Sequence, residues 1–257
     1  MRGSGAARVV LVHGAWHRGS SWEPVSAELE RAGVPAVAPD LPAGGPGAGH
    51  AELVAPVLDA AQGSVVLVGH SLGGLVAAAA AGRLGAERVR ALVLVGALVP
   101  EPGRAYLDRL RAERDLMVPG YDTGVRRGEG ALTYWPDAGT VAAGLYRGVA
   151  DELVDAGTAR DRADALVAAA AAQMRPQDWT VLKEASPLGA WPDVRTVSVI
   201  CADDRVVDPA GGRRDAARVG AEVVELPGGH FPMLTRPREL ADLLGGLATG
   251  AGVPAAG

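Results

Sequence analysis

A serine lies at the centre of the hexapeptide at residues 69–74, which reads Gly-His-Ser-Leu-Gly-Gly. An apolar run at residues 65–68 precedes it and a small-residue run at 75–81 follows it, so the order is strand, tight turn, helix. A serine on so sharp a turn projects from the edge of the sheet, and glycines beside it leave room for the strained backbone. The pattern predicts that Ser71 is a nucleophile. An ordinary turn is the alternative, because the chain holds 36 glycines.

A serine hydroxyl needs a neighbouring base to remove its proton near pH 7, and the imidazole of histidine suits this role. His230 lies between the last predicted strand and the last predicted helix, so it should share the carboxyl edge of the sheet with Ser71. We therefore predict that His230 is the base. The remaining histidines are expected to pack in loops or to bind backbone groups, with a substrate contact open for His17 alone: His13, His17, His50 and His70.

The base needs an acid that holds its tautomer and stabilises the imidazolium. A predicted strand at residues 194–200 leads into a loop that contains Asp203, Asp204 and Asp208. Asp208 precedes Pro209 at a predicted helix start, where an N-cap role is expected. Periodicity does not choose between Asp203 and Asp204. With either, the chain order is serine, aspartate, histidine.

Two backbone N–H groups should bind the oxyanion of a tetrahedral intermediate. One is expected from Leu72, directly after the nucleophile and at the N-terminus of a predicted helix. The second is expected from Ala15, in the loop that follows the first predicted strand. A plain turn after that strand is the alternative.

Six nearly continuous apolar runs rich in Val and Leu are typical of buried parallel strands. They lie at residues 8–12, 34–38, 65–68, 89–95, 194–200 and 221–226. Helical patterns between most of them lie at residues 22–32, 51–61, 72–84, 210–219 and 238–247. This alternation predicts a doubly wound α/β sheet of about six mainly parallel strands.

The alternation stops after the fourth strand. Residues 97–187 predict a mostly helical cap, inserted into a core made of residues 1–96 and 188–257. Cap helices are expected near residues 102–114, 138–153 and 158–173. A second small domain with no part in the chemistry is the alternative. Small residues predict a frayed tail at 248–257.

Composition restricts the partners. The net charge is −5 and the basic residues are scattered, which argues against nucleic acid, and the sequence lacks an apolar run that could span a membrane. Cys201 is the only cysteine, which excludes an internal disulfide and agrees with a cytoplasmic location.

No zinc-binding spacing or dinucleotide motif occurs in the sequence, so we expect no metal or organic cofactor. The oligomeric state is open, with a homodimer as one option.

With these residues in place, the chain resembles the α/β-hydrolase superfamily, and in particular the compact branch of plant methyl-ester esterases and hydroxynitrile lyases. The likeness extends over the first strand and loop (10–16), the serine turn (69–74) and the histidine loop (228–234), and near residues 174–177 it is weak. Residues 200–204 are similar to the acid loop of that branch. There the second acidic position belongs to the triad, so the resemblance favours Asp204. It also implies the α/β-hydrolase fold.

Two departures from the branch favour ester hydrolysis. Its lyases carry a threonine after the histidine of the oxyanion loop and a lysine after the catalytic histidine, where this chain has Gly14 and Phe231. Superfamily dehalogenases and epoxide hydrolases carry aspartate at the nucleophile position, where this chain has Ser71.

We therefore predict a serine hydrolase that cleaves a small, largely apolar carboxylic ester through an acyl-enzyme. The expected pocket residues are Trp16, His17, Trp135, Trp179 and Phe231, with cap-core packing as the alternative for the tryptophans. Rival hypotheses are hydrolysis, carbon–carbon cleavage or cyclisation of an aromatic or polyketide-like substrate, a hydroxynitrile lyase, and a ligand-binding receptor.

Overall fold

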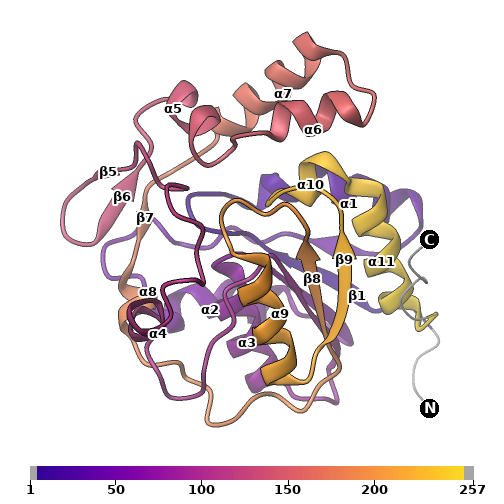
Figure 1. The fold of residues 1–257 in the computed structure, drawn as a ribbon. Coiled ribbons are helices and arrows are strands. Elements are labelled where there is room, and N and C mark those ends of the chain that lie inside the picture. The colour runs from indigo at the N-terminus through magenta and orange to yellow at the C-terminus, as the bar shows by residue number, and fades with distance from the viewer. Residues whose placement is uncertain (1–4, 252–257) are drawn as a thin grey trace.

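A computed structural model describes residues 5–251 and has one six-stranded sheet at its centre (Figure 1). All neighbouring strands in it are parallel, in the order β2-β1-β3-β4-β8-β9, which confirms the predicted sheet. The strands are β1 (Arg8–Val12), β2 (Ala36–Val37), β3 (Val65–His70), β4 (Val89–Val95), β8 (Thr196–Cys201) and β9 (Glu222–Leu226).

The strand register brings four loops to one edge of the sheet. Val12 pairs with Gly69, so β1 and β3 end together, and Cys201 pairs with Leu226, so β8 and β9 do as well. Strand order reverses between β1 and β3, and such a switch point opens a crevice at the carboxyl ends of the strands. The loops that carry the predicted site residues therefore meet at this crevice.

Helices cover both faces of the sheet (Figure 1). One layer is α1 (Glu23–Arg31) with α11 (Pro237–Thr249), and the other contains α2 (His50–Ala60), α3 (Gly73–Leu84) and α9 (Pro209–Val219). The buried alanines of α3 let this helix lie close to β3. The central strands β3 and β4 are almost fully buried, as their continuous apolar sequences predict.

A long segment is inserted between β4 and β8, and its middle part lies over the carboxyl edge of the sheet (Figure 1). Its helices are α4 (Tyr106–Ala112), α5 (Ala138–Ala143), α6 (Val149–Asp155), α7 (Arg160–Ala172) and α8 (Thr180–Lys183). It also contains a small antiparallel sheet that the sequence did not predict, made of β5 (Arg126–Arg127), β6 (Leu132–Tyr134) and β7 (Gln177–Asp178). We call this segment, residues 97–187, the cap.

The cap helices differ from their predicted bounds. The helix expected at 138–153 is broken into α5 and α6 by a turn that contains Gly144 and Gly148. Gly148 has φ of 92°, a left-handed conformation that ends a helix for most residues and that glycine adopts without strain. The helix expected at 102–114 is shorter, because it begins only at Tyr106.

The predicted frayed tail is wrong at its start. Helix α11 continues through Thr249, and Ala248 is fully buried with its carbonyl oxygen accepting a hydrogen bond from the N–H of Ala7 at 2.8 Å. Small residues here serve packing, because the last turn of α11 lies against the start of β1. Gly250, with φ of 85°, ends the helix. Residues 252–257 of that prediction lie outside the described residues.

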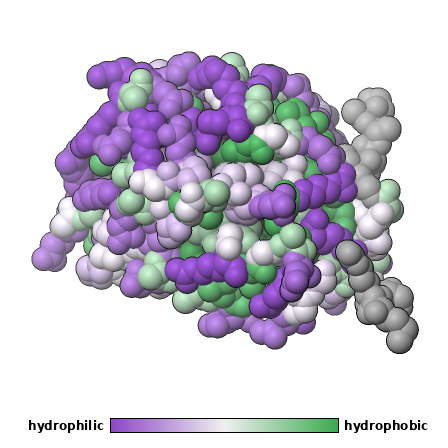
Figure 2. Space-filling model, turned by 90° about the horizontal axis from the view of Figure 1, so that it is seen from below, coloured by the Kyte–Doolittle hydropathy of each residue, from purple (hydrophilic) through white to green (hydrophobic). Residues whose placement is uncertain are grey.

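The face opposite the cap carries hydrophobic side chains in separate small areas between hydrophilic ones (Figure 2). Within residues 5–251, no helix combines the length and the apolar character needed to cross a membrane.

Candidate active site

The turn after β3 holds Ser71 in a strained conformation. Its φ is 52°, a left-handed value that only Ser71 and Trp16 adopt among the described non-glycine residues. Three backbone hydrogen bonds fix this conformation: the Ser71 N–H donates to Val95 O at 3.2 Å, and Ser71 O accepts from the N–H groups of Gly74 and Leu98, each at 2.9 Å. Such strain costs about 1–3 kcal/mol, and it is typical of a residue that the fold presents for chemistry.

The glycines around Ser71 are required by close backbone contacts. A Cβ atom added at Gly69 would lie 2.5 Å from the Gly73 carbonyl oxygen, and one at Gly73 would lie 2.5 Å from the Val12 carbonyl oxygen. At Gly74 it would lie 2.5 Å from the Leu98 oxygen. The start of α3 thus packs against β1 and β3 without room for a side chain, which is the physical reason for the glycine spacing.

His230 lies in the loop between β9 and α10 (Pro232–Thr235), and its imidazole contacts an aspartate from the loop after β8. His230 Nδ1 and Asp204 Oδ2 are 2.8 Å apart, and both side chains are buried. The other carboxylate oxygen of Asp204 accepts the N–H groups of Val206 at 2.8 Å and Val207 at 3.0 Å. With its Nδ1–H donated to the carboxylate, His230 has a free Nε2 that can accept a proton.

The other two candidate acids have different partners. Asp203 accepts the Gly228 N–H at 3.2 Å and so supports the histidine loop from below the imidazole, without contact to the ring in the hydrogen bonds of the described residues. Asp208 accepts the Gly211 N–H at 2.8 Å and is the N-cap of α9. The choice between Asp203 and Asp204, which periodicity left open, therefore has a geometric answer in the hydrogen bond to His230.

Sequence reasoning missed Gly96, which lies at the end of β4. Its φ is 47°, and a Cβ atom there would lie 3.0 Å from Asp204 Oδ2 and 3.2 Å from His230 Nδ1. Only glycine leaves space for this pair of side chains. Its position directly after a central strand was the one available signal.

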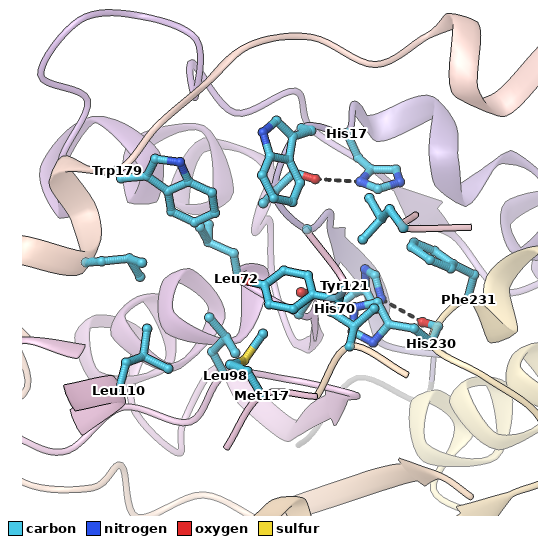
Figure 3. A pocket seen from close by; sticks show the side chains of 17 residues that line it. His17, His70, Leu72, Leu98, Leu110, Met117, Tyr121, Trp179, His230 and Phe231 are labelled. Atoms are coloured by element: carbon cyan, nitrogen blue, oxygen red, sulfur yellow. Dashed lines mark hydrogen bonds between the residues drawn. The ribbon is translucent and has the colours of Figure 1, made fainter. Parts of the chain in front are cut away.

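Ser71 and His230 line the same cavity, between the sheet edge and the cap (Figure 3). Within the described residues the Ser71 hydroxyl makes no hydrogen bond, and in unliganded enzymes the contact between nucleophile and base is often loose. The cavity is narrow: the space open to the centre of a water molecule is about 40 Å³. Apolar side chains that the sequence analysis did not single out form much of its wall: Leu98, Leu110, Met117, Leu145, Leu182 and Val206.

The predicted oxyanion donors, Ala15 and Leu72, both line this cavity. Among the hydrogen bonds of the described residues, neither backbone N–H has an acceptor. Leu72 directly precedes α3, whose positive dipole end favours a negative charge there. A Cβ atom at Gly14 would lie 2.9 Å from His70 Nδ1 and 3.0 Å from Ser71 Cβ, so glycine lets the Ala15 loop approach the serine.

Two other buried histidines, His13 and His70, bind backbone groups as expected and hold the surrounding loops. His70 Nε2 donates to the His230 carbonyl oxygen at 2.9 Å, a support for the base that the sequence did not indicate, and burial lowers its pKa well below the usual value. His13 donates from Nδ1 to Gly14 O, and burial lowers its pKa to about 3. His50 begins α2 and lies away from the cavity.

His17 is the one histidine for which the sequence left a substrate contact open, and it does line the cavity. Its Nδ1 donates to Ala15 O at 2.6 Å and its Nε2 accepts the Tyr146 hydroxyl at 2.7 Å. Burial lowers the pKa of His17 to about 4, so the ring is neutral. It links the oxyanion loop to the cap.

The predicted pocket aromatics divide into two groups. Trp16, Trp179 and Phe231 line the cavity, but Trp135 does not, so that prediction is wrong for Trp135. Its ring lies edge-on to Trp16, with centroids 5.7 Å apart, and fills the space above Gly144, where a Cβ atom would lie 2.9 Å from it. Trp135 is thus part of the cap core, behind the cavity wall.

Sequence reasoning also missed Arg175, which ties the cap to the oxyanion loop. Its backbone N–H donates to Trp16 O at 2.9 Å and its Nε to His17 O at 2.8 Å. Its Nη2 donates to Leu41 O at 2.6 Å and lies 3.1 Å from His13 Nε2. The weak resemblance at residues 174–177 was the only sign of this segment in the sequence.

Comparisons with known proteins agree with this architecture. A carbendazim-hydrolysing esterase of Nocardioides is 36% identical over 112 residues, which are 39% of this chain and 46% of that protein. The rice protein named "Probable esterase PIR7A" (Oryza sativa subsp. indica) is 29% identical over 93% of this chain and 96% of its own. The structure of a pyrethroid hydrolase from Sphingobium faniae superposes with a TM-score of 0.73 at 21% identity, covering 94% of this chain and 97% of that one.

The family comparison covers most of the chain. Residues 9–243 match the model described as "Alpha/beta hydrolase family", a span that contains β1 to β9, the cap and each predicted catalytic side chain. The six-stranded parallel sheet with a serine turn after β3 has the fold that the resemblance implied. This chain therefore belongs to the alpha/beta hydrolase family.

Proposed function

We propose that this protein hydrolyses carboxylic esters of small, largely apolar substrates through a serine acyl-enzyme. One observation carries the proposal: His230, which is hydrogen-bonded to Asp204, lines the same apolar cavity as Ser71, and Ser71 is held at positive φ. That arrangement supplies a nucleophile, a base and an orienting acid. The relatives named as esterases and the solved pyrethroid hydrolase support the ester as the reacting group.

The reaction begins when Ser71 Oγ attacks the ester carbonyl carbon and His230 Nε2 takes the hydroxyl proton. The carbonyl oxygen becomes an oxyanion and accepts hydrogen bonds from the N–H groups of Ala15 and Leu72. The C–O bond to the alcohol then breaks, and His230 returns the proton to the leaving oxygen. A water molecule, deprotonated by His230, attacks the acyl-enzyme, and release of the acid restores the Ser71 hydroxyl.

Cyanohydrin cleavage is disfavoured by the space around Gly14. The lyases of the related branch carry threonine there, but in this chain a side chain at Gly14 would collide with His70 and Ser71. Position 231, where those lyases carry lysine, holds a buried phenylalanine. This chain therefore lacks both the threonine hydroxyl and the lysine ammonium group that those lyases carry at these two positions.

Labelling by a fluorophosphonate probe tests the proposed nucleophile. The probe forms a phosphonyl ester with an activated serine, so mass spectrometry of the digested protein should find the label on the peptide that contains Ser71. His230→Ala should abolish labelling while the protein stays folded, because the base is lost. Label on another serine, or equal labelling of the His230→Ala variant, would refute the mechanism.

We also propose a cytoplasmic location and a small-molecule substrate as the partner. Support for the location comes from the cysteine usage: Cys201 is free and buried, and burial raises the pKa of its thiol well above the usual value. A reduced thiol of this kind needs no oxidising compartment. Cell fractionation with an antibody to the native protein would detect it in the cytosolic fraction if the proposal holds.

A further inference from the structure

The cavity that contains Ser71 is too small to hold both halves of an ester larger than the simplest ones. A site for one water molecule takes about 10–15 Å³ when volume is counted as the space open to its centre. By the same measure this cavity offers about 40 Å³. Part of any larger substrate therefore lies outside this cavity.

A second, larger cleft lies directly behind one wall of this cavity. It has about 200 Å³ of space by the same measure and lies between α7 of the cap and the core elements η1 (Gly19–Trp22), α1 and α10. Its walls are mainly apolar and include Leu166, Ala170, Met174, Met233 and Leu234, while Arg18 and Glu23 also line it. Its lining residues do not include the proposed triad or the oxyanion donors, so it is a space separate from the inner cavity.

Among residues 5–251, His17 and Phe231 alone line both spaces, and Tyr146 completes the wall from the cap. The rings of Tyr146 and Phe231 pack edge to face with centroids 4.5 Å apart, and the Tyr146 hydroxyl binds His17 Nε2 at 2.7 Å. The wall is thus one layer of side chains thick. Tyr146 lies on the turn between α5 and α6, so a single side chain of the cap closes this part of the wall.

The position of the base decides which half of the ester faces this wall. His230 returns its proton to the leaving alcohol oxygen, so the alcohol group lies on the His230 side of the cavity. Phe231 directly follows His230, and Figure 3 shows Phe231 and His17 on the side of the cavity opposite Trp179 and Leu110. Met233 and Leu234, which line the outer cleft, belong to α10, which directly follows Phe231.

We infer that the cleft between α7 and α10 is the binding subsite for the alcohol group of the ester, and that it takes an unbranched or ring-shaped apolar group of several carbons. The inner cavity, lined by Leu98, Leu110 and Met117, takes a short acyl group. The inference rests on the proposed ester hydrolysis, and it assigns the alcohol half of the substrate to the cleft and the acyl half to the inner cavity. For the alcohol group to reach the cleft, the hydrogen bond between the Tyr146 hydroxyl and His17 Nε2 must open.

Two ester series test this assignment, with kcat/KM as the readout. In ethyl, butyl and hexyl acetate only the alcohol lengthens, and in ethyl acetate, ethyl butyrate and ethyl hexanoate only the acyl group lengthens. Each methylene buried in the cleft should raise kcat/KM up to about fourfold. We expect hexyl acetate to exceed ethyl acetate at least tenfold, and ethyl hexanoate to fall below ethyl acetate. An increase along the acyl series instead, or along neither series, would overturn the assignment.

A variant in the cleft gives a second, independent measurement. Ala170 on α7 is half-buried and lines the cleft, so Ala170→Phe should fill it and bring the ratio of hexyl to ethyl acetate turnover close to one. The matched control is Ala168→Phe, on the same helix but exposed and outside the cleft, which should keep the wild-type ratio. Equal ratios in the two variants would refute the subsite.

The outcome also separates this inference from the function on which it rests. If Ser71→Ala abolishes hydrolysis of ethyl acetate but the alcohol series is flat, the subsite is wrong and the esterase proposal stands. If no ester in either series is hydrolysed in a Ser71-dependent way, both are wrong.

Discussion

At the scale of single residues, three aspartates follow β8 within a short loop and have three different roles. Asp204 holds the imidazole of His230, Asp203 holds the backbone of the histidine loop at Gly228, and Asp208 caps α9. Two N–H groups fix the Asp204 carboxylate so that one oxygen faces His230. The orientation of the base therefore depends on Asp204 alone among these acids.

Replacing Asp204 by asparagine should lower kcat for ester hydrolysis by about 10³- to 10⁴-fold, because the amide favours the tautomer of His230 that cannot accept the serine proton. The matched control is Asp203→Asn, whose amide oxygen can still accept the Gly228 N–H, and it should keep kcat within about tenfold of the wild type. Steady-state kinetics on one ester would measure both variants. Equal losses of kcat would show that the acid has been misassigned.

At the scale of elements, the site is built where strands end and helices begin, and the cap supports it through one short segment. Arg175, just after α7, donates two hydrogen bonds to carbonyl oxygens of the loop that presents Ala15, and a third to Leu41 O in the segment after β2. Gln177 in β7 adds a longer contact, since its Oε1 lies 3.4 Å from the Trp16 N–H. Trp16 itself has φ of 61°, so this loop is strained and depends on these contacts.

Arg175→Met should therefore lower kcat by about 10- to 100-fold with little change in KM, because the oxyanion donor is displaced while the apolar cavity remains. Arg175→Lys keeps one charged donor and should recover part of the loss. Arg162→Met, on the exposed face of α7, is the control and should match the wild type. A change in KM alone would assign Arg175 to substrate binding instead of loop positioning.

At the scale of the whole molecule, folding buries several neutral histidines between the core and the cap. His13, His17 and His70 all lie out of water, and desolvation lowers the pKa of each. A buried imidazole with a lowered pKa binds fewer protons than the same residue in the unfolded chain. The folded state is consequently favoured above the unfolded pKa of about 6.5 and loses this advantage as the pH falls.

We expect the free energy of unfolding to be lower at pH 5 than at pH 7, by about 2 kcal/mol for each of His13 and His17. For His17 and His13 the loss continues toward their folded pKa values of about 4 and about 3. Urea unfolding at pH 7 and pH 5 measures the difference. His13→Gln should shrink that difference by the share of one histidine, whatever its effect on stability at pH 7. An unchanged difference would mean that His13 binds as many protons at pH 5 in the folded protein as in the unfolded chain.

Local sequence was enough to predict where the six strands lie, the serine turn and the loops that carry Asp204 and His230. The prediction that all six strands are buried is wrong for β9, which is mostly exposed because it lies at the edge of the sheet. Buried parallel strands need continuous apolar runs, and a turn that leaves no room for a Cβ atom at Gly69 and Gly73 needs glycine, so these features are written in short stretches of chain. Family resemblance added the choice of Asp204 over Asp203 and the alpha/beta hydrolase fold, which the family match confirms. The roles of the catalytic residues stay predictions until the variants are measured.

Only the tertiary structure decided which distant groups touch. The bond of His70 to His230, the ties of Arg175 to the oxyanion loop and the place of Trp135 behind the cavity join residues that are far apart in the chain. The same holds for the wall of His17, Tyr146 and Phe231. Such contacts depend on how the cap packs over the sheet, and packing is a property of many side chains at once, which no local pattern of apolar and polar residues encodes.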